Sequence, residues 1–227
     1  MTSARYAHTA SVLTNGSVLV TGGVDGLALS SSELYDPLTG MWTITGNMST
    51  GRYLHTTSVL TNGKVLVAGG SNMAASLSSA ELYDPSTGIW TTTGNMTDSR
   101  FFHTASILTS GKVLITAGYT IGYMNNAEVY DSSTGMWAVT GSTNYARAYH
   151  TATLLTNGKV LVVGGSNSVG YINSAELYNP STGIWTIAAN MSSARREHTA
   201  SILTNGKVLI VCGFNSAVLN SSELYQP

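Results

Sequence analysis

A histidine that returns at nearly constant spacing constrains this chain more than any other feature. The spacing is 47, 48, 47 and 48 residues between His8, His55, His103, His150 and His198, and the residues around each histidine recur with it. Internal repetition at a period of about 40 to 50 residues is typical of the blades in a radial array of small β-sheets. A single repeat of this length cannot bury its own apolar faces, so the repeats must stack on one another. We therefore expect one domain over residues 1–227, with repeats at about 1–47, 48–95, 96–142, 143–190 and 191–227.

Each repeat contains four runs with strand character, which in the second repeat are residues 55–61, 64–68, 80–83 and 89–93. The second run is almost continuously apolar, as expected for a strand that is covered on both faces. An Asn-Gly or Ser-Gly pair separates the first two runs in every repeat. This pair predicts a hairpin with a type I′ turn, in which both central residues have positive φ. The Asp-Pro-Ser-Thr-Gly segment before the fourth run predicts a second hairpin.

Glycine and tryptophan mark two further positions in the repeat. The second run ends in a glycine pair, which becomes Ala117-Gly118 in the third repeat and Cys212-Gly213 in the fifth. Glycine at the end of a buried strand predicts a close approach of two backbones or a positive φ. A tryptophan opens the fourth run, where a large ring can wedge between adjacent sheets; these residues are Trp42, Trp90, Trp137 and Trp185.

The glycine pair, a tyrosine and the tryptophan recur in this order after an arginine-containing loop, and the pattern resembles the Kelch repeat over the whole chain. The resemblance implies an all-β, five-bladed Kelch-type β-propeller of four-stranded antiparallel blades, with the first strand lining the channel and the tryptophan strand outermost. The recurring tyrosines are Tyr35, Tyr83, Tyr130, Tyr178 and Tyr225. The fifth repeat stops before its tryptophan, so we expect 19 strands and a last blade that lacks its outermost strand. An open sheet edge favours pairing with another chain, and we expect self-association there.

Composition excludes several classes of partner. The formal net charge is −1 and Lys and Arg form no cluster, so nucleic acid and anionic membranes are not expected partners. No apolar run is long enough to span a bilayer, and the first residues carry no signal-peptide pattern. The sequence does not distinguish a cytoplasmic parent protein from an extracellular one. Because Met1 leads straight into a repeat, we expect a repeat domain cut from a longer protein or an engineered chain.

The ionisable residues offer little material for catalysis. Most of them recur with the repeat, and an asymmetric centre would depend on Asp25, Asp98, Arg196 and Glu197. We expect no enzyme activity, no cofactor and no metal. A histidine present in every copy is interpreted as a hydrogen-bonded structural element between blades. A copper centre like that of galactose oxidase is excluded, because the one cysteine occupies a glycine-pair position and no unique pair of histidines with a tyrosine stands out.

The loops carry the stronger functional signal. Only the segment between the glycine pair and the repeated glutamate varies in length, and such tolerance is typical of a binding loop on a rigid scaffold. The loops between blades end in a repeated arginine. A ring of arginine and aromatic residues at the channel mouth resembles the ligand face of Kelch adaptor proteins, which grip acidic peptides with arginines. The alternative role for these arginines is a hydrogen bond to neighbouring backbone carbonyls. The candidate ligand-binding residues are Arg5, Arg52, Arg100, Arg147, Arg195, Arg196, Glu197, Asp25, Tyr119, Tyr123, Tyr171 and Phe214.

These features predict a non-catalytic binding scaffold that presents a loop face to a protein or peptide partner. Low charge and the loop aromatics leave open a second function, a carbohydrate-binding or carbohydrate-processing module of an extracellular protein, with a glycan as its ligand. The near-identity of the copies and the abrupt ends leave open a third, a designed or consensus-like propeller without a natural ligand.

Overall fold

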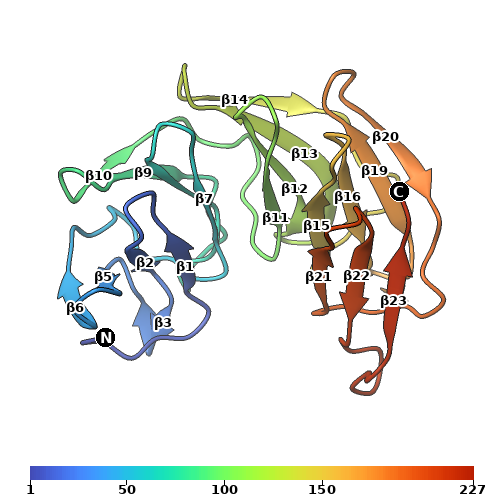
Figure 1. Cartoon of the computed structure of the whole chain (residues 1–227), viewed down its shortest axis with the longest axis horizontal. Helices are drawn as coiled ribbons and strands as arrows, with labels where there is room; N and C mark the ends of the chain where they lie inside the picture. Colours follow the sequence, from blue (N-terminus) through green and yellow to red (C-terminus); the bar gives the residue numbers. More distant parts are fainter. The chain divides into compact units, whose positions relative to one another are not determined.

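The computed structural model describes residues 1–227 and contains only β-structure, in 23 strands. Four sheets have four antiparallel strands and a fifth has three, and each repeat of the sequence supplies one of these five blades (Figure 1). Two short two-stranded sheets complete the structure. The predicted all-β fold class is confirmed, as is the three-stranded last blade. The structure contains no helix that could cross a membrane.

The blades follow one strand pattern. Blade 1 contains β1 (Thr9–Val12), β2 (Val18–Thr21), β5 (Ser32–Asp36) and β6 (Met41–Ile44). Blade 2 contains β7 (Thr56–Val59), β8 (Val65–Ala68), β9 (Ala80–Asp84) and β10 (Ile89–Thr92). Blade 3 contains β11 (Thr104–Ile107), β12 (Val113–Tyr119), β13 (Tyr123–Asp131) and β14 (Met136–Thr140). Blade 4 contains β15 (Thr151–Leu154), β16 (Val160–Val163), β19 (Ala175–Asn179) and β20 (Ile184–Ala188). Blade 5 contains β21 (Thr199–Ile202), β22 (Val208–Val211) and β23 (Ser222–Tyr225).

The chain forms two compact units. Unit 1 consists of residues 1–101 and 131–137 and holds blades 1 and 2, and unit 2 consists of residues 102–130 and 138–227 and holds most of blade 3 with blades 4 and 5. Within each unit the first strands of successive blades lie side by side, β1 beside β7 in unit 1 and β15 beside both β11 and β21 in unit 2. The first strand is therefore the innermost strand of its blade and the tryptophan strand the outermost, as in a β-propeller.

The first hairpin of each blade forms at the predicted place but with a different turn. In blade 1, the Gly16 N–H donates to the Leu13 carbonyl at 2.9 Å, and the Leu13 N–H donates to the Ser17 carbonyl at 2.8 Å. Gly16 has a φ of 86°, whereas Asn15 does not have a positive φ. The predicted type I′ turn is therefore wrong, and the loop is a type I turn closed by a left-handed glycine. The Asn15 side chain caps this turn by accepting from the Ser17 N–H at 3.0 Å.

The glycine pairs lie where the next blade comes closest. Gly22 has a φ of 65°, and a Cβ placed on it would lie 2.5 Å from the Arg52 carbonyl oxygen of the next blade. Gly164 repeats this arrangement against the Arg195 carbonyl, at 2.6 Å. Positive φ and close backbone approach, both predicted from the sequence, are thus found together.

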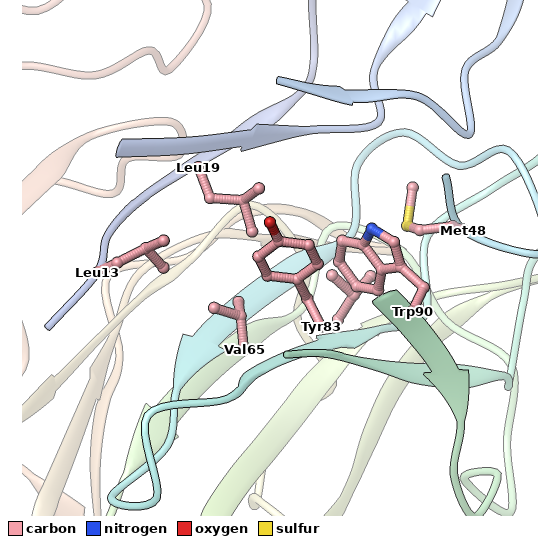
Figure 2. Close-up of a cluster of buried hydrophobic side chains, with 7 residues drawn as sticks. Leu13, Leu19, Met48, Val65, Tyr83 and Trp90 are labelled. Carbon is pink, nitrogen blue, oxygen red and sulfur yellow. The ribbon is translucent and has the colours of Figure 1, made fainter. Parts of the chain in front are cut away.

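Trp90, Trp137 and Trp185 wedge between neighbouring blades, as predicted, whereas Trp42 of the first blade contacts Tyr35 of its own blade. In unit 1 the Trp90 ring stacks on Tyr83 with 5.1 Å between ring centroids, and its Nε1–H donates to the Gly46 carbonyl of blade 1 at 3.0 Å. Leu13, Leu19 and Met48 of blade 1 complete this buried cluster with Val65 and Val67 of blade 2 (Figure 2). Trp185 forms the same contacts in unit 2, with Tyr178 at 5.0 Å and the Gly141 carbonyl at 2.8 Å. Apolar burial between blades therefore holds each unit together.

Three of the variable loops form β-hairpins. Blade 1 carries β3 (Val24–Asp25) and β4 (Leu27–Ala28), and blade 4 carries β17 (Ser166–Asn167) and β18 (Gly170–Tyr171). In blade 3 the hairpin is an extension of β12 and β13, which pairs Tyr119 with Tyr123. The hairpins of blades 3 and 4 carry Tyr119, Tyr123 and Tyr171, whereas Phe214 lies in the blade 5 loop and forms isolated strand bridges with Arg196 and Val218.

Candidate ligand-binding site

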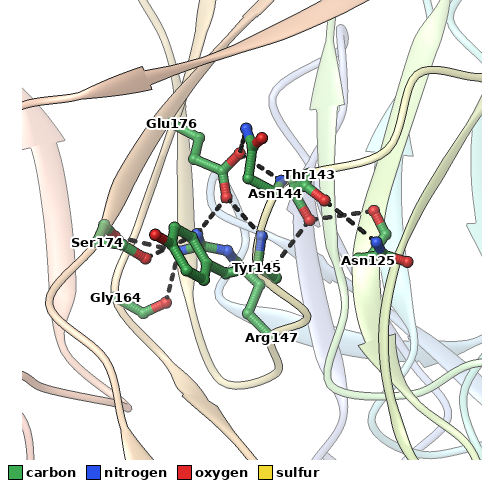
Figure 3. Close-up of polar contacts among 8 residues, drawn as sticks. All are labelled: Asn125, Thr143, Asn144, Tyr145, Arg147, Gly164, Ser174 and Glu176. Atoms are coloured by element: carbon green, nitrogen blue, oxygen red, sulfur yellow. Dashed lines mark hydrogen bonds and ion pairs between the residues drawn. The ribbon is translucent and has the colours of Figure 1, made fainter.

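The repeated arginine is a buried hub inside its own blade. The Arg147 guanidinium donates to the Gly164 carbonyl at 3.0 Å, to the Ser174 carbonyl at 3.1 Å and to the Ser174 hydroxyl at 3.0 Å (Figure 3). It also forms an ion pair with Glu176 at 2.6 Å, and neither side chain is exposed to solvent. The Glu176 carboxylate accepts in addition from the Asn144 N–H at 2.7 Å. One arginine thus ties the loop that enters the blade to the blade's second and third strands.

The other blades repeat this arrangement. The Arg–Glu distances are 3.0, 2.9 and 2.9 Å for Arg5 with Glu33, Arg52 with Glu81 and Arg195 with Glu223. Arg100 is buried as well. Burial acts to raise the pKa of the Glu223 carboxyl, but hydrogen bonds from Ser192, Ser193 and Arg195 outweigh it and lower that pKa. The bonds to backbone carbonyls that the sequence left as the alternative role are formed, so the repeated arginines do not line a surface.

The repeated histidines connect one blade to the next. Nε2 of His55 lies 2.9 Å from the Thr9 hydroxyl of the preceding blade, and His150 and His198 form the same bond with Thr104 and Thr151. Burial lowers the pKa of His55 to about 3, and the charge of Arg52 adds to this effect. Burial also lowers the pKa of His198 to about 4. These imidazoles are therefore neutral near pH 7. The structure contains no group of three or more His, Cys, Asp or Glu side chains placed to hold a metal ion.

The residue before each repeated histidine has a left-handed backbone, and we call these five residues the αL positions. They are Ala7, Leu54, Phe102, Tyr149 and Glu197, with φ between 53° and 59°. Within each unit, the N–H group at one αL position donates to the carbonyl at the preceding one. The distances are 3.1 Å from Leu54 to Ala7, 3.3 Å from Tyr149 to Phe102 and 3.0 Å from Glu197 to Tyr149. This chain of hydrogen bonds fixes the αL backbone from blade to blade.

Aromatic side chains gather around Arg196 in unit 2. The Arg196 guanidinium carbon lies 5.2 Å from the Tyr149 ring centroid and 5.4 Å from those of Tyr171 and Phe214. A strand bridge between Arg196 and Phe214 holds the arginine against its own blade's variable loop. Three rings around one guanidinium give cation–π attraction of about 0.5–2 kcal/mol for each good contact. Arg196 is thereby held in one place.

The rings of Phe102, Tyr119 and Tyr123 lie near Tyr149, one of the three rings around this arginine. Phe102 stacks on Tyr149 with 3.9 Å between centroids, and Tyr119 meets Tyr123 edge to face at 5.1 Å. Burial raises the pKa of the Tyr149 hydroxyl, with smaller contributions from Tyr123 and Tyr119, whereas Arg196 lowers it. We call the six rings the aromatic cluster: Phe102, Tyr119, Tyr123, Tyr149, Tyr171 and Phe214.

Sequence reasoning found part of this site. Among the candidate residues, the structure brings together Arg196, Glu197 and the four loop aromatics, which are Tyr119, Tyr123, Tyr171 and Phe214. Asp25 belongs to unit 1, where it is exposed in the β3–β4 hairpin. Phe102 and Tyr149 were missed. The signal for both was their place directly before the repeated histidine, at a position whose residue changes in every copy.

Comparisons with known proteins agree with the repeat pattern. A family model described as the KLHDC2/KLHL20/DRC7 Kelch-repeats domain matches residues 55–226, and one described as the Kelch motif matches residues 5–49. No curated protein matches the sequence. A solved structure titled "Structure of YjhT" is 18% identical, with a TM-score of 0.78 over 97% of this chain and 81% of that chain. At this identity the likeness shows the fold alone.

Replacing Arg147 with methionine is expected to lower the free energy of unfolding by about 3–5 kcal/mol, because Glu176 would keep a buried and unpaired charge. Urea unfolding measures the change. Lys159→Met, a charge removal in the β15–β16 turn of the same blade, is the matched control and should cost about 0.5 kcal/mol or less. Equal losses for the two variants would contradict the structural role of Arg147.

Stability is expected to fall as the pH is lowered from about 6.5 to 5. The folded-state pKa of His55 lies below its unfolded value of 6.5, so the unfolded chain binds more protons in this range. Each such histidine costs about 2 kcal/mol over that interval. Urea unfolding midpoints at several pH values test this. His55→Gln should make the free energy of unfolding depend less on pH, by the contribution of one histidine. A midpoint that does not change between pH 6.5 and 5 would show that the histidines are not buried in the neutral form.

Proposed function

Because this chain belongs to the Kelch-repeat family, we propose that it is a non-catalytic binding scaffold whose partner, a protein or peptide, docks an acidic group on Arg196 within the aromatic cluster. Kelch-repeat propellers are generally scaffolds for protein interactions. The buried positions of the repeated Arg, Glu and His side chains support a structural use of these groups rather than a chemical one. The observation that carries the proposal is the state of Arg196.

Arg196 has spare donor capacity at the surface. Its side chain is 30% exposed, and this exposure distinguishes it from the repeated arginines; its Nε has no hydrogen-bond partner but is itself buried, as in those five arginines. The nearest carboxylate oxygen, from Glu197, lies 3.9 Å away, which is too long for a hydrogen bond. The rings hold the guanidinium in place without using its donors. A carboxylate of a partner would bind a charged guanidinium whose conformation is already fixed. Because little side-chain freedom is then lost, the entropy cost of binding is lower.

The surroundings of Arg196 also fit a protein partner. Binding hot spots combine arginine with large aromatic side chains that exclude water. Here two tyrosines and a phenylalanine surround one arginine: Tyr171 on the β17–β18 hairpin, Tyr149 at an αL position and Phe214 in the blade 5 loop. Flat tyrosine rings also stack on sugars, so a glycan is the alternative ligand of the same cluster.

Peptide selection from a random library, followed by calorimetry on the selected peptides, tests the proposal. We expect peptides with an acidic residue, and Arg196→Gln should weaken them about 10- to 100-fold, the equivalent of one charged hydrogen bond. Lys207→Gln removes the same charge at the β21–β22 turn and should leave the affinity unchanged. Failure to select any peptide, or binding on a glycan array instead, would overturn the proposal. Equal effects of the two variants would do the same.

A second proposal concerns β23, which pairs only with β22. A groove of about 230 Å³ lies beside it, lined by Met191, Ile210 and Tyr225 among others. In blades 2 and 4 a tryptophan stacks on the tyrosine that corresponds to Tyr225. The groove is therefore shaped to accept a large side chain next to the open edge of β23. We propose that β23 of a second copy pairs with it.

Ala189 favours pairing of β23 with a second copy of the chain over completion of blade 5 by a fourth strand that follows the usual turn. The corresponding residues of the first three repeats are Gly46, Gly94 and Gly141, where a Cβ would lie 2.1–2.4 Å from a turn carbonyl of the next blade. The fourth repeat has Ala189 instead, so a turn of the same kind would collide with its methyl group. Direct antiparallel pairing of two β23 strands needs no such turn.

Sedimentation velocity over a range of concentrations is expected to show a monomer–dimer equilibrium. Leu224 lies on β23 and is 51% exposed, and Leu224→Lys should shift the equilibrium to monomer because lysine blocks edge pairing. Ile187→Lys, on the outer strand β20 of blade 4, is the matched control and should leave dimerisation unchanged. A strictly monomeric protein at high concentration would contradict this proposal.

A further inference from the structure

The αL positions retain a side chain where the backbone favours glycine. A left-handed φ costs a non-glycine residue about 1–2 kcal/mol. At the first position of the glycine pair, which also has positive φ, three of the five copies use glycine. At the αL positions no copy does. The side chain is therefore retained at a cost in stability, in every blade.

The identity of that side chain differs in all five copies. Ala7, Leu54, Phe102, Tyr149 and Glu197 range from small to aromatic to charged. The arginine two positions earlier and the following histidine are present in every repeat, whereas the residue between that arginine and the αL position also varies, as Tyr6, Tyr53, Phe101, Ala148 or Arg196. A packing role shared by all blades would require similar side chains. The variation instead fits a position that each blade uses to present a different group.

The αL positions of unit 2 contribute residues to the site proposed above. Tyr149 is both a cation–π partner of Arg196 and the stacking partner of Phe102. Glu197 follows Arg196 directly, and its side chain is 55% exposed. The hydrogen bonds between successive αL positions fix their backbones, so their side chains leave the blades in a constant geometry. Tyr149 and Glu197 thus lie next to Arg196, and Phe102 of the preceding blade adjoins them through its contact with Tyr149.

We propose that the three αL positions of unit 2, Phe102, Tyr149 and Glu197, determine which ligand this scaffold accepts, and that they select a peptide with a single carboxylate beside an aromatic side chain. This inference rests on the proposed function, which assigns the carboxylate to Arg196. The stacked Phe102–Tyr149 pair offers a flat apolar surface to a neighbouring aromatic side chain. Glu197 repels a second acidic group at the same place.

Two substitutions each replace one αL residue with the residue that another αL position of the same chain carries. Phe102→Leu installs the residue of position 54, and Glu197→Ala installs the residue of position 7, so both new side chains are known to fit this backbone. We expect Phe102→Leu to weaken peptides that pair one acidic with one aromatic residue about fivefold or more, and to abolish their selection over acidic peptides without an aromatic residue. We expect Glu197→Ala to strengthen peptides with two adjacent acidic residues about fivefold or more. Leu54→Ala in unit 1 is the matched control and should change neither preference.

The experiment compares the peptides selected by the wild-type protein and by each variant, with thermal unfolding recorded alongside. Selection of no peptide by the wild type would mean that the proposed function itself is wrong. Selection of acidic peptides that depends on Arg196, with unchanged preferences in Phe102→Leu and Glu197→Ala, would overturn this inference and leave the proposed function standing. A lower melting temperature with unchanged preferences would assign the αL side chains to packing and would overturn it as well.

Discussion

The buried ion pair between the repeated arginine and glutamate is the interaction on which the blades depend. Burying two charges costs several kcal/mol, and the cost is offset only where the remaining donors and acceptors are satisfied. Arg147 meets most of this condition: it donates to two carbonyls, a hydroxyl and Glu176, and only its buried Nε has no partner, while Glu176 also accepts from the backbone of the entering loop. The pair therefore joins three segments that are far apart in sequence, and each blade can stack on the next with its loop already in place.

This use of the repeated charges determines where binding can occur. Because the repeated arginines and histidines are buried in bonds within and between blades, the groups left for a ligand are those that do not repeat. Arg196 is the non-repeated arginine, and it lies among rings supplied by the variable loops and the αL positions. The scaffold and the site are thus built from separate sets of residues, so the ligand preference can change without loss of the fold.

The sequence predicted the strands well because each is bounded by strong local signals. The runs at 64–68 and 89–93 became β8 (Val65–Ala68) and β10 (Ile89–Thr92), and the three-stranded last blade followed from counting repeats. The turn between the first two strands was misjudged because Asn-Gly is compatible with more than one turn type, and only the glycine has positive φ. The burial of Arg52 could not be predicted, because its partner Glu81 lies 29 residues away and is visible only once the blade is formed. Phe102 and Tyr149 were missed for the same reason, since their contact joins two blades.

Chemical modification of arginine in the native protein tests the central claim most directly. Phenylglyoxal reacts with accessible guanidinium groups, and mass spectrometry of the digested protein locates the modified residues among the six arginines. The account predicts that Arg196 is modified, while Arg5, Arg52, Arg100, Arg147 and Arg195 react only after unfolding. Modification of several of these five in the folded protein, at a rate close to that of Arg196, would contradict it.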